Sequence, residues 1–483
     1  MSENSLKSKT VSGIGWSFID NIANQGITFL VGLVLARLLS PHEYGLIGII
    51  TIFIAVFNTL VDSGLSNALI RKVNPSEEDF NTAFFANLGA SIFFFLVLFL
   101  SAPLIASFFE EPILTVLLRV MSCIIIINAF IIIQKVKLTK QIDFKTQAKC
   151  SLVSSTVSGV IGISMALNGL GVWSLVGQQI SRQFLFASSL WFWGRWIPTL
   201  KVSVRSFKEL FGFGWKILAS SLLDTTWKEI YQVVIGKCYT AATLGLFTRA
   251  RQFAMIFSNN LSSIIQKVSF PTLSNIQDDH VLLKNSYRKL IRISSFVTFV
   301  LMTWLASVAK PLIIILIGEQ WVACIPFLQI LCLQMFFYPI DAINLNLLQV
   351  FGKSNIYLYL EIIKKITFVV PLLLGVFVDI YWMLWASVVT SVIELVLNGL
   401  WAGAPIDYSF KDELKDMLPS LGLCFAIAIC MYIPTLCIIN NFLLITVQSL
   451  LCFATIWIIS CVFKLEEVKY IKGIVITFKN KML

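Results

Sequence analysis

Gly13-Ile14-Gly15-Trp16 opens a long apolar stretch that ends at Leu39-Ser40-Pro41-His42-Glu43-Tyr44-Gly45-Leu46. The same pattern returns later in the chain. Gly212-Phe213-Gly214-Trp215 opens a second apolar stretch, which ends at Thr243-Leu244-Gly245-Leu246-Phe247. Both landmarks recur at almost the same spacing, and this agreement indicates an internal duplication of the chain.

The composition predicts a protein that crosses a membrane many times. The chain has 483 residues, of which 57% are hydrophobic and 13% are charged, and its mean hydropathy is +0.84. A soluble globular chain is about 25% charged. The apolar stretches run from end to end, so we expect no appended soluble domain. Residues 1–10 lead into a segment that contains Asp20 and Asn24 without a clear cleavage site, so we expect no cleavable signal peptide.

Charge and reactive side chains exclude several function classes. The net charge of +11 would suggest nucleic acid in a soluble protein, but Lys and Arg in cytoplasmic loops explain it here, so no nucleic-acid partner is expected. The ten cysteines sit singly and are expected to be reduced packing residues. The two histidines, His42 and His280, lie far apart. We therefore expect no catalytic residue, no metal and no cofactor.

The apolar stretches predict fourteen transmembrane helices, since about 20 apolar residues cross the hydrocarbon core. They form two groups of six and a final pair. The predicted spans are 14–37, 44–61, 82–101, 112–133, 148–167, 171–193, 213–236, 243–264, 289–309, 325–350, 356–376, 381–401, 418–438 and 441–463.

The basic residues predict the orientation of these helices. The N-terminus and alternate loops carry far more Lys and Arg than the opposite loops, with Lys135, Lys137, Lys140, Lys145 and Lys149 in one loop alone. Because such residues accumulate on the cytoplasmic side, both termini are expected in the cytoplasm.

The predicted domains are an N-lobe at 1–193, a cytoplasmic linker at 194–212, a C-lobe at 213–401, the last helix pair with its preceding loop at 402–463, and an amphipathic tail at 464–483.

Charged and amide side chains inside the predicted spans are the candidate site residues. An ionisable group at mid-bilayer costs about 2.5–3.5 kcal/mol, so it usually faces a cavity or a partner. Asp20 and Asn24 share one face of the first span, where they either line a hydrophilic cavity or form hydrogen bonds between helices. In the seventh span, Asp224 and Lys228 are four residues apart and either pair with each other or face water.

Further candidates lie in the sixth, eighth and tenth spans. Arg182 lies midway along the sixth span, Arg249 begins the eighth, and Asp341 and Asn344 share a face of the tenth. Polar residues thus occur in both groups of six, which favours a central aqueous cavity between two bundles. Arg182, Lys228 and Arg249 offer positive charge to an anionic head group, because guanidinium groups suit phosphate oxygens.

Several quoted segments resemble polysaccharide-export flippases of the multidrug/oligosaccharidyl-lipid/polysaccharide (MOP) exporter superfamily. The resemblance lies in the repeated glycine–tryptophan openings, in Leu39-Ser40-Pro41 with Tyr44-Gly45, in 169–175 and in the segment 244–279. It covers nearly the whole chain and is strongest for the Wzx-type branch that includes colanic acid and teichuronic acid exporters. It implies an all-α membrane protein with two pseudo-symmetric six-helix lobes around a V-shaped central cavity, followed by a C-terminal helix pair.

The resemblance also implies a function. Such proteins flip undecaprenyl-pyrophosphate-linked oligosaccharide repeat units across the bacterial inner membrane by alternating access, with H⁺ or Na⁺ as a coupling ion. The expected partners are the lipid-linked oligosaccharide and membrane lipid. The main alternative is a cation-coupled multidrug exporter with Asp20 and Asp341 as ion sites. Two further alternatives are an enzyme and a transporter of lipid II. An enzyme is disfavoured because the loops are short and carry no paired carboxylates except Glu110-Glu111.

Overall fold

The computed structural model describes residues 3–62, 64–194, 196–463 and 467, which contain helices and no strand. The predicted all-α class is therefore confirmed. The chain forms two compact units, Met1–Gly245 and Leu246–Leu483. Apart from Glu467, the predicted amphipathic tail at 464–483 lies outside the described residues.

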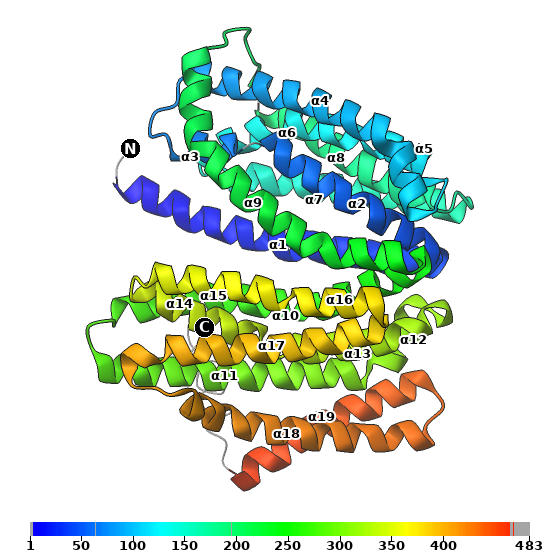
Figure 1. Ribbon diagram of the computed structural model, residues 1–483, viewed down its shortest axis with the longest axis vertical. Helices are drawn as coiled ribbons and strands as arrows, with labels where there is room; N and C mark the ends of the chain where they lie inside the picture. The colour runs from blue at the N-terminus through cyan, green and yellow to red at the C-terminus, as the bar shows by residue number, and fades with distance from the viewer. Residues whose placement is uncertain (1–2, 63, 195, 464–466, 468–483) are drawn as a thin grey trace. The chain divides into compact units, whose positions relative to one another are not determined.

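The first unit is a bundle of long helices with two short ones (Figure 1). Its α7 packs against α1, α8 and α6, while α4 packs against α5, α6 and α9. The helices are α1 (Glu3–Leu38), α2 (Pro41–Asp62), α3 (Leu65–Arg71), α4 (Glu77–Phe109), α5 (Leu114–Met121), α6 (Cys123–Lys140), α7 (Phe144–Leu167), α8 (Trp173–Gly194) and α9 (Val204–Cys238).

In the second unit, α11 packs against α13, α14 and α18, and α18 packs against α19 (Figure 1). The helix α10 (Ala241–Asn275) begins in the first unit and continues in the second. The others are α11 (His280–Ser307), α12 (Ala309–Ile317), α13 (Ile325–Gln334), α14 (Tyr338–Val350), α15 (Ser354–Thr367), α16 (Val369–Phe377), α17 (Ile380–Ala402), α18 (Phe410–Cys437) and α19 (Asn441–Phe463), with short 3₁₀ turns η1 (Glu319–Cys324) and η2 (Ala404–Ile406).

Ten helical segments of the described chain are long and apolar enough to cross a membrane. They coincide with ten of the fourteen predicted spans. The other four predicted spans fall on α8, α9, α10 and the α15–α16 pair, which are helical but more polar. The chain is therefore a multi-pass membrane protein, and the count of fourteen stays a prediction.

Three predicted single spans are broken into two helices: 112–133 becomes α5–α6, and a proline explains the break in each of the other two. Pro339 lies in the first turn of α14 and Pro371 in the first turn of α16. A proline has no N–H to donate to the carbonyl four residues earlier, so the preceding helix ends at that point. The predicted spans 325–350 and 356–376 therefore become α13–α14 and α15–α16.

The helix predicted to open the C-lobe at residue 213 begins earlier, at Val204, because Ser203 caps it by accepting a hydrogen bond from the Ser206 N–H. The predicted linker 194–212 therefore contains the first turns of α9. This helix packs against α2, α3 and α4 of the first unit. The lobe boundaries drawn from the sequence repeat differ from this division into compact units, and they stay a prediction.

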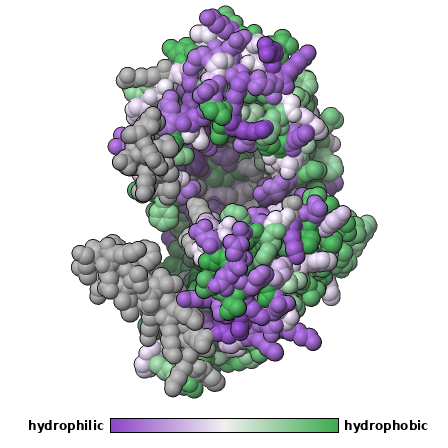
Figure 2. Space-filling model, turned by 90° about the vertical axis from the view of Figure 1, so that its left-hand side faces the viewer, coloured by the Kyte–Doolittle hydropathy of each residue, from purple (hydrophilic) through white to green (hydrophobic). Residues whose placement is uncertain are grey.

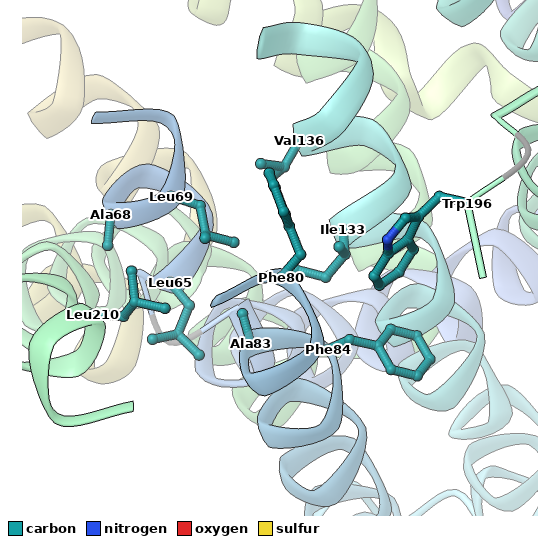
Figure 3. Packing of buried hydrophobic residues seen from close by; sticks show 10 residues of the cluster. All are labelled: Leu65, Ala68, Leu69, Phe80, Ala83, Phe84, Ile133, Val136, Trp196 and Leu210. Carbon is teal, nitrogen blue, oxygen red and sulfur yellow. The ribbon is translucent and has the colours of Figure 1, made fainter. Parts of the chain in front are cut away.

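The rest of the linker folds onto the first unit. Trp196 lies beside Phe80 and Phe84 of α4, in a core that also takes side chains from α3, α6 and α9 (Figure 3). Its indole N–H donates to Glu77 Oε2 over 2.8 Å, and its carbonyl accepts from Gln134 over 2.7 Å. The tryptophan thus anchors the chain between α8 and α9 to α4 and α6.

Figure 2 shows hydrophilic residues on the surface of each unit. Five basic side chains of the described chain form ion pairs in helix-end or loop segments that the sequence predicts to be cytoplasmic. They are Lys72, Lys137, Arg288, Arg292 and Lys364. This distribution is typical of a membrane protein surface that faces water.

Candidate substrate pocket

A polar pocket with a volume of about 520 Å³ opens within the first unit. Its wall comes mainly from α1, α7 and α8, with one residue from α2 and two residues from α6. Amides, hydroxyls and charged groups dominate the lining. The residues are Asp20, Asn24, Thr28, Ile54, Ile124, Lys135, Gln147, Ser151, Ser154, Gln178, Gln179, Arg182, Gln183 and Phe186.

Helical periodicity explains why these side chains meet. On α1, Asp20, Asn24 and Thr28 recur every four residues and therefore lie on one face of the helix. Gln178 and Arg182 of α8 have the same spacing. The packing of α7 against both α1 and α8 brings these two polar faces to one cavity.

Asn24 is the centre of the hydrogen bonds in the pocket. Its amide nitrogen donates to Ser151 Oγ over 2.5 Å. Its carbonyl oxygen accepts from Ser155 Oγ over 2.5 Å and from Arg182 Nη2 over 3.2 Å. The α7 hydroxyls therefore fix the amide of Asn24, and the fixed amide positions the guanidinium of Arg182.

Arg182 and Asp20 bring opposite charges to the pocket. Arg182 makes one hydrogen bond within the described residues, to Asn24, although a guanidinium carries five N–H donors. Asp20 lies close enough for its charge to act on Arg182, and its Oδ1 has no hydrogen-bond partner in the described part of the chain. The pocket thus offers donors for an anionic ligand and an acceptor for hydroxyl groups.

The structure brings together Asp20, Asn24 and Arg182 among the predicted site residues. Asp224 and Lys228 lie elsewhere, on α9, where they form an ion pair of 2.7 Å with both side chains more than half exposed. They thus satisfy each other, as one of the two sequence interpretations allowed. Their contact with substrate stays a prediction.

Arg249 and the α14 residues lie in the second unit and outside this pocket. Arg249 is buried, with its guanidinium 5.9 Å from the ring centre of Trp321 and 2.5 Å from Gln252 Oε1. Asp341 and Asn344 are buried among helices, where Asp341 accepts a hydrogen bond from Asn398 over 2.9 Å. Their role in binding also stays a prediction.

Sequence reasoning did not select the α7 side of the pocket. Gln147, Ser151 and Ser154 follow the helical spacing of one face, which is the signal that could have found them. Serine is common where transmembrane helices pack closely, so this face does not stand out among the serines of α7. Lys135 of α6 was counted only as a loop cation, yet it lines the pocket.

An apolar cavity with a volume of about 810 Å³ lies in the second unit, between α11, α13 and α18. Leu333, Phe336, Phe425 and Leu436 are among its lining side chains, and Lys310 is its one charged lining residue. It contrasts with the polar pocket of the first unit.

All ten cysteines are free thiols, and no group of three or more His, Cys, Asp or Glu side chains in the described residues is arranged to hold a metal ion.

Comparisons with known proteins agree with the membrane fold. The chain is 26% identical to the succinoglycan biosynthesis transport protein ExoT of Rhizobium meliloti over 68% of this chain and 67% of that protein. It is also 26% identical to the lipopolysaccharide biosynthesis protein WzxC of Escherichia coli over 77% of this chain and 76% of that protein.

Solved structures show the same fold. The lipid II flippase MurJ, in an inward closed conformation, matches with a TM-score of 0.73 and 15% identity over 94% of this chain and 98% of its own. An inward-facing multidrug resistance MATE transporter of the MOP superfamily matches with a TM-score of 0.62 and 15% identity over 79% of this chain and 94% of its own. Residues 34–326, more than half of the chain, match the polysaccharide biosynthesis protein family, and the chain belongs to that family.

Proposed function

We propose that this protein is a flippase that moves undecaprenyl-pyrophosphate-linked oligosaccharide repeat units across the bacterial inner membrane for surface polysaccharide biosynthesis. The observation that carries the proposal is the polar pocket between α1, α7 and α8. Such a pocket gives a sugar a route through helices that are otherwise apolar. Membership of the polysaccharide biosynthesis family and the likeness to ExoT and WzxC support the same substrate class.

The side chains of the pocket suit the two polar parts of this substrate. Gln178, Gln179 and Gln183 both donate and accept hydrogen bonds, as sugar hydroxyls require. Arg182 and Lys135 supply positive charge for the pyrophosphate, and the planar guanidinium can bind two phosphate oxygens at once. The polyprenyl chain stays in the apolar surroundings of the helices.

The proposal includes a topology and a transport cycle. Fourteen helices cross the membrane in two pseudo-symmetric six-helix lobes and a final pair, with both termini in the cytoplasm. The excess of basic residues in the predicted cytoplasmic loops supports this orientation. The lobes alternate between inward-open and outward-open states, and H⁺ or Na⁺ drives the cycle. The protein carries out transport rather than a chemical reaction.

Deleting the gene and analysing surface polysaccharide together with lipid-linked intermediates tests the proposal. We expect loss of the polymer and accumulation of undecaprenyl-linked repeat units, both reversed by a plasmid copy. Normal polymer without accumulated intermediates, in a strain that lacks any other flippase gene of this family, would contradict it. Extrusion of a cationic dye by cells that produce the protein would instead favour the multidrug exporter, for which Asp20 in the pocket offers an anion.

A further inference from the structure

Buried polar side chains join four helices of the second unit, α11, α14, α17 and α18. Tyr287 Oη donates to Asn344 Oδ1 over 2.5 Å, and Asn344 Nδ2 donates to Glu413 Oε1 over 3.0 Å. Asn398 Nδ2 donates to Asp341 Oδ1 over 2.9 Å. The exposed fraction is 8% for Asp341 and zero for the other four. Two carboxyl groups are thus held by amides in the interior of the bundle.

One oxygen of Glu413 and one of Asn398 remain without a hydrogen-bond partner in the described residues. Glu413 Oε2 points at α17, because a Cβ atom added at Gly399 would lie 2.4 Å from it. Both orphan atoms are acceptors when Glu413 is ionised, and a buried acceptor without a donor costs about 1–3 kcal/mol. A proton on Glu413 Oε2 neutralises the carboxylate and removes its need for a second donor.

The negative charge of the nearby Asp416 also favours the neutral form of Glu413. Arg288 and Arg292 of α11 both bind Asp416, each over 2.7 Å, and Tyr408 donates to the same carboxylate over 2.8 Å. Asp416 therefore offsets one of these two positive charges, and its own negative charge acts on Glu413. Besides Tyr287 on α11, the other acidic, basic and histidine side chains on the neighbouring elements are His280, Lys284 and Lys289 on α11, Asp341 on α14, Glu361, Lys364 and Lys365 on α15, Glu394 on α17, and Lys411, Asp412 and Lys415 on α18, while α19 carries no charged residue.

Two effects oppose a neutral Glu413, the hydrogen bond from Asn344 and the helix dipole, and both are smaller than the cost of desolvation. The residue lies in the first turns of α18, where the positive end of the helix dipole favours a carboxylate by about 0.3–1 kcal/mol. Removing an unpaired carboxylate from water costs several kcal/mol. The cost of desolvation exceeds the gain from the dipole, so the carboxyl group keeps its proton in this packing.

We propose that Glu413 is a proton-binding site, protonated while α18 is packed against α14 and α17 and ionised when this packing opens to water. On opening, the O–H bond of the carboxylic acid breaks and the proton passes to water, so no oxidant or reductant takes part. A proton needs only one oxygen, which is what the site offers, whereas a metal ion needs several ligands. The proposal does not depend on the identity of the transported substrate.

Thermal unfolding of the purified full-length protein between pH 4 and pH 8 tests this site with Glu413→Gln. Glutamine keeps the acceptor for Asn344 and supplies a permanent N–H donor in place of the acidic proton. The folded wild type binds more protons than the unfolded chain, so its stability decreases as the pH rises. We expect equal midpoints at the acidic end and a wild-type midpoint below that of Glu413→Gln at the alkaline end. Parallel curves would overturn the proposal.

Asp416→Asn is the second variant, one helical turn further along α18. It removes the partner of Arg288 and Arg292 and the negative charge that acts on Glu413, so its midpoint should be lower at every pH and its slope shallower than that of the wild type, whereas Asp412→Asn, the matched control, should keep the wild-type slope. A second measurement does not rely on unfolding. The infrared spectrum at neutral pH should show the carbonyl stretch of a protonated carboxylic acid that is weaker in Glu413→Gln and unchanged in Asp412→Asn. Identical bands in the wild type and Glu413→Gln would contradict a protonated Glu413.

Discussion

At the residue scale, Asn24 determines how the pocket presents its positive charge. Ser151 and Ser155 of α7 hold its amide from one side, and Arg182 of α8 donates to its oxygen from the other. A long Arg side chain would otherwise lose rotamer freedom when it binds a ligand. The asparagine has already restrained it, so under the proposed function Arg182 binds an anionic group with less loss of entropy.

Arg182→Gln should reduce export by about tenfold or more, since a hydrogen bond to a charged group contributes about 1.5–3 kcal/mol. The measurement is polymer output in a deletion strain that carries the variant at wild-type protein level. Lys149→Gln is the matched control, because Lys149 is an exposed cation on α7 outside the pocket lining. Equal export by Arg182→Gln and the wild type would remove Arg182 from the binding site.

The sequence identified part of the pocket for a physical reason. Asp20, Asn24 and Arg182 stand out because polar groups of this kind are costly in an apolar stretch. Ser151 and Ser154 are small and can satisfy themselves on the backbone of their own helix, as Ser154 does with the Ser151 carbonyl. Such residues give no signal until the packing of α7 against α1 and α8 is known.

At the element scale, a polar cluster connects α3, α4 and α9 in the first unit. Asp79 is almost fully buried in the first turn of α4, where it accepts from Ser76 N–H over 2.8 Å, from Ser206 Oγ and from Lys72 Nζ at 3.0 Å. Hydrogen bonding to Asp79 raises the pKa of Lys72 above its ordinary value. The charge of Lys72 therefore contributes stability at neutral pH, and this contribution is lost only in strongly alkaline solution.

Asp79→Ala should lower the free energy of unfolding by about 1.5–3 kcal/mol, because it removes the buried acceptor of the Ser76 N–H, the Ser206 hydroxyl and Lys72. Glu209→Gln is the control, since Glu209 binds the same lysine over 3.1 Å but is 59% exposed. It should cost less than about 1 kcal/mol. Thermal unfolding of the purified variants measures both. Equal losses for the two variants would show that burial of Asp79 does not determine the strength of the pair.

Glycines of the repeated motif allow two helix ends to meet in the first unit. A Cβ atom at Gly45 of α2 would lie 1.7 Å from the carbonyl oxygen of Ala241, and one at Gly245 would lie 1.8 Å from that of Pro41. Both obstacles are backbone atoms, which cannot rotate away as a side chain can. The first turns of α2 and α10 therefore approach more closely than any other residue at these positions would permit.

Gly45→Ala and Gly245→Ala should each reduce the amount of folded protein strongly, because the methyl group forces the two backbones apart. Gly89→Ala in α4 is the control, since nothing lies within 4 Å of its added Cβ. It should be neutral or stabilising, as alanine favours a helix over glycine by about 0.5–1 kcal/mol. Size-exclusion chromatography of fluorescently tagged variants in detergent measures the folded fraction. Wild-type yield for Gly45→Ala would contradict the close approach.

At the scale of the whole molecule, the number of membrane crossings depends on helices that carry many polar residues. α10 is 35 residues long but is not among the ten segments that are apolar enough by composition alone. It begins after Tyr239 and ends before Asp278. If it crosses the membrane, these two ends lie on opposite sides.

Reporter fusions after Tyr239 and after Asp278 test this crossing. An alkaline phosphatase that is active only outside the cytoplasm should be active at the first position and inactive at the second. Fusions after Gly169, between α7 and α8, and after Ile142, between α6 and α7, provide the outer and inner controls. Equal activity at Tyr239 and Asp278 would show that α10 does not cross, and the orientation of every later helix would have to be reversed.

The sequence by itself determined the class of the protein, ten of its membrane-spanning segments and three residues of its pocket, because hydropathy and the cost of buried charge act locally along a helix. Tertiary structure alone decided which polar faces meet. It placed the serines of α7 against Asn24, left Asp224 paired with Lys228 on an exposed face of α9, and enclosed Glu413 among four helices. These outcomes depend on contacts between helices far apart in the chain, and a local sequence pattern does not predict such contacts.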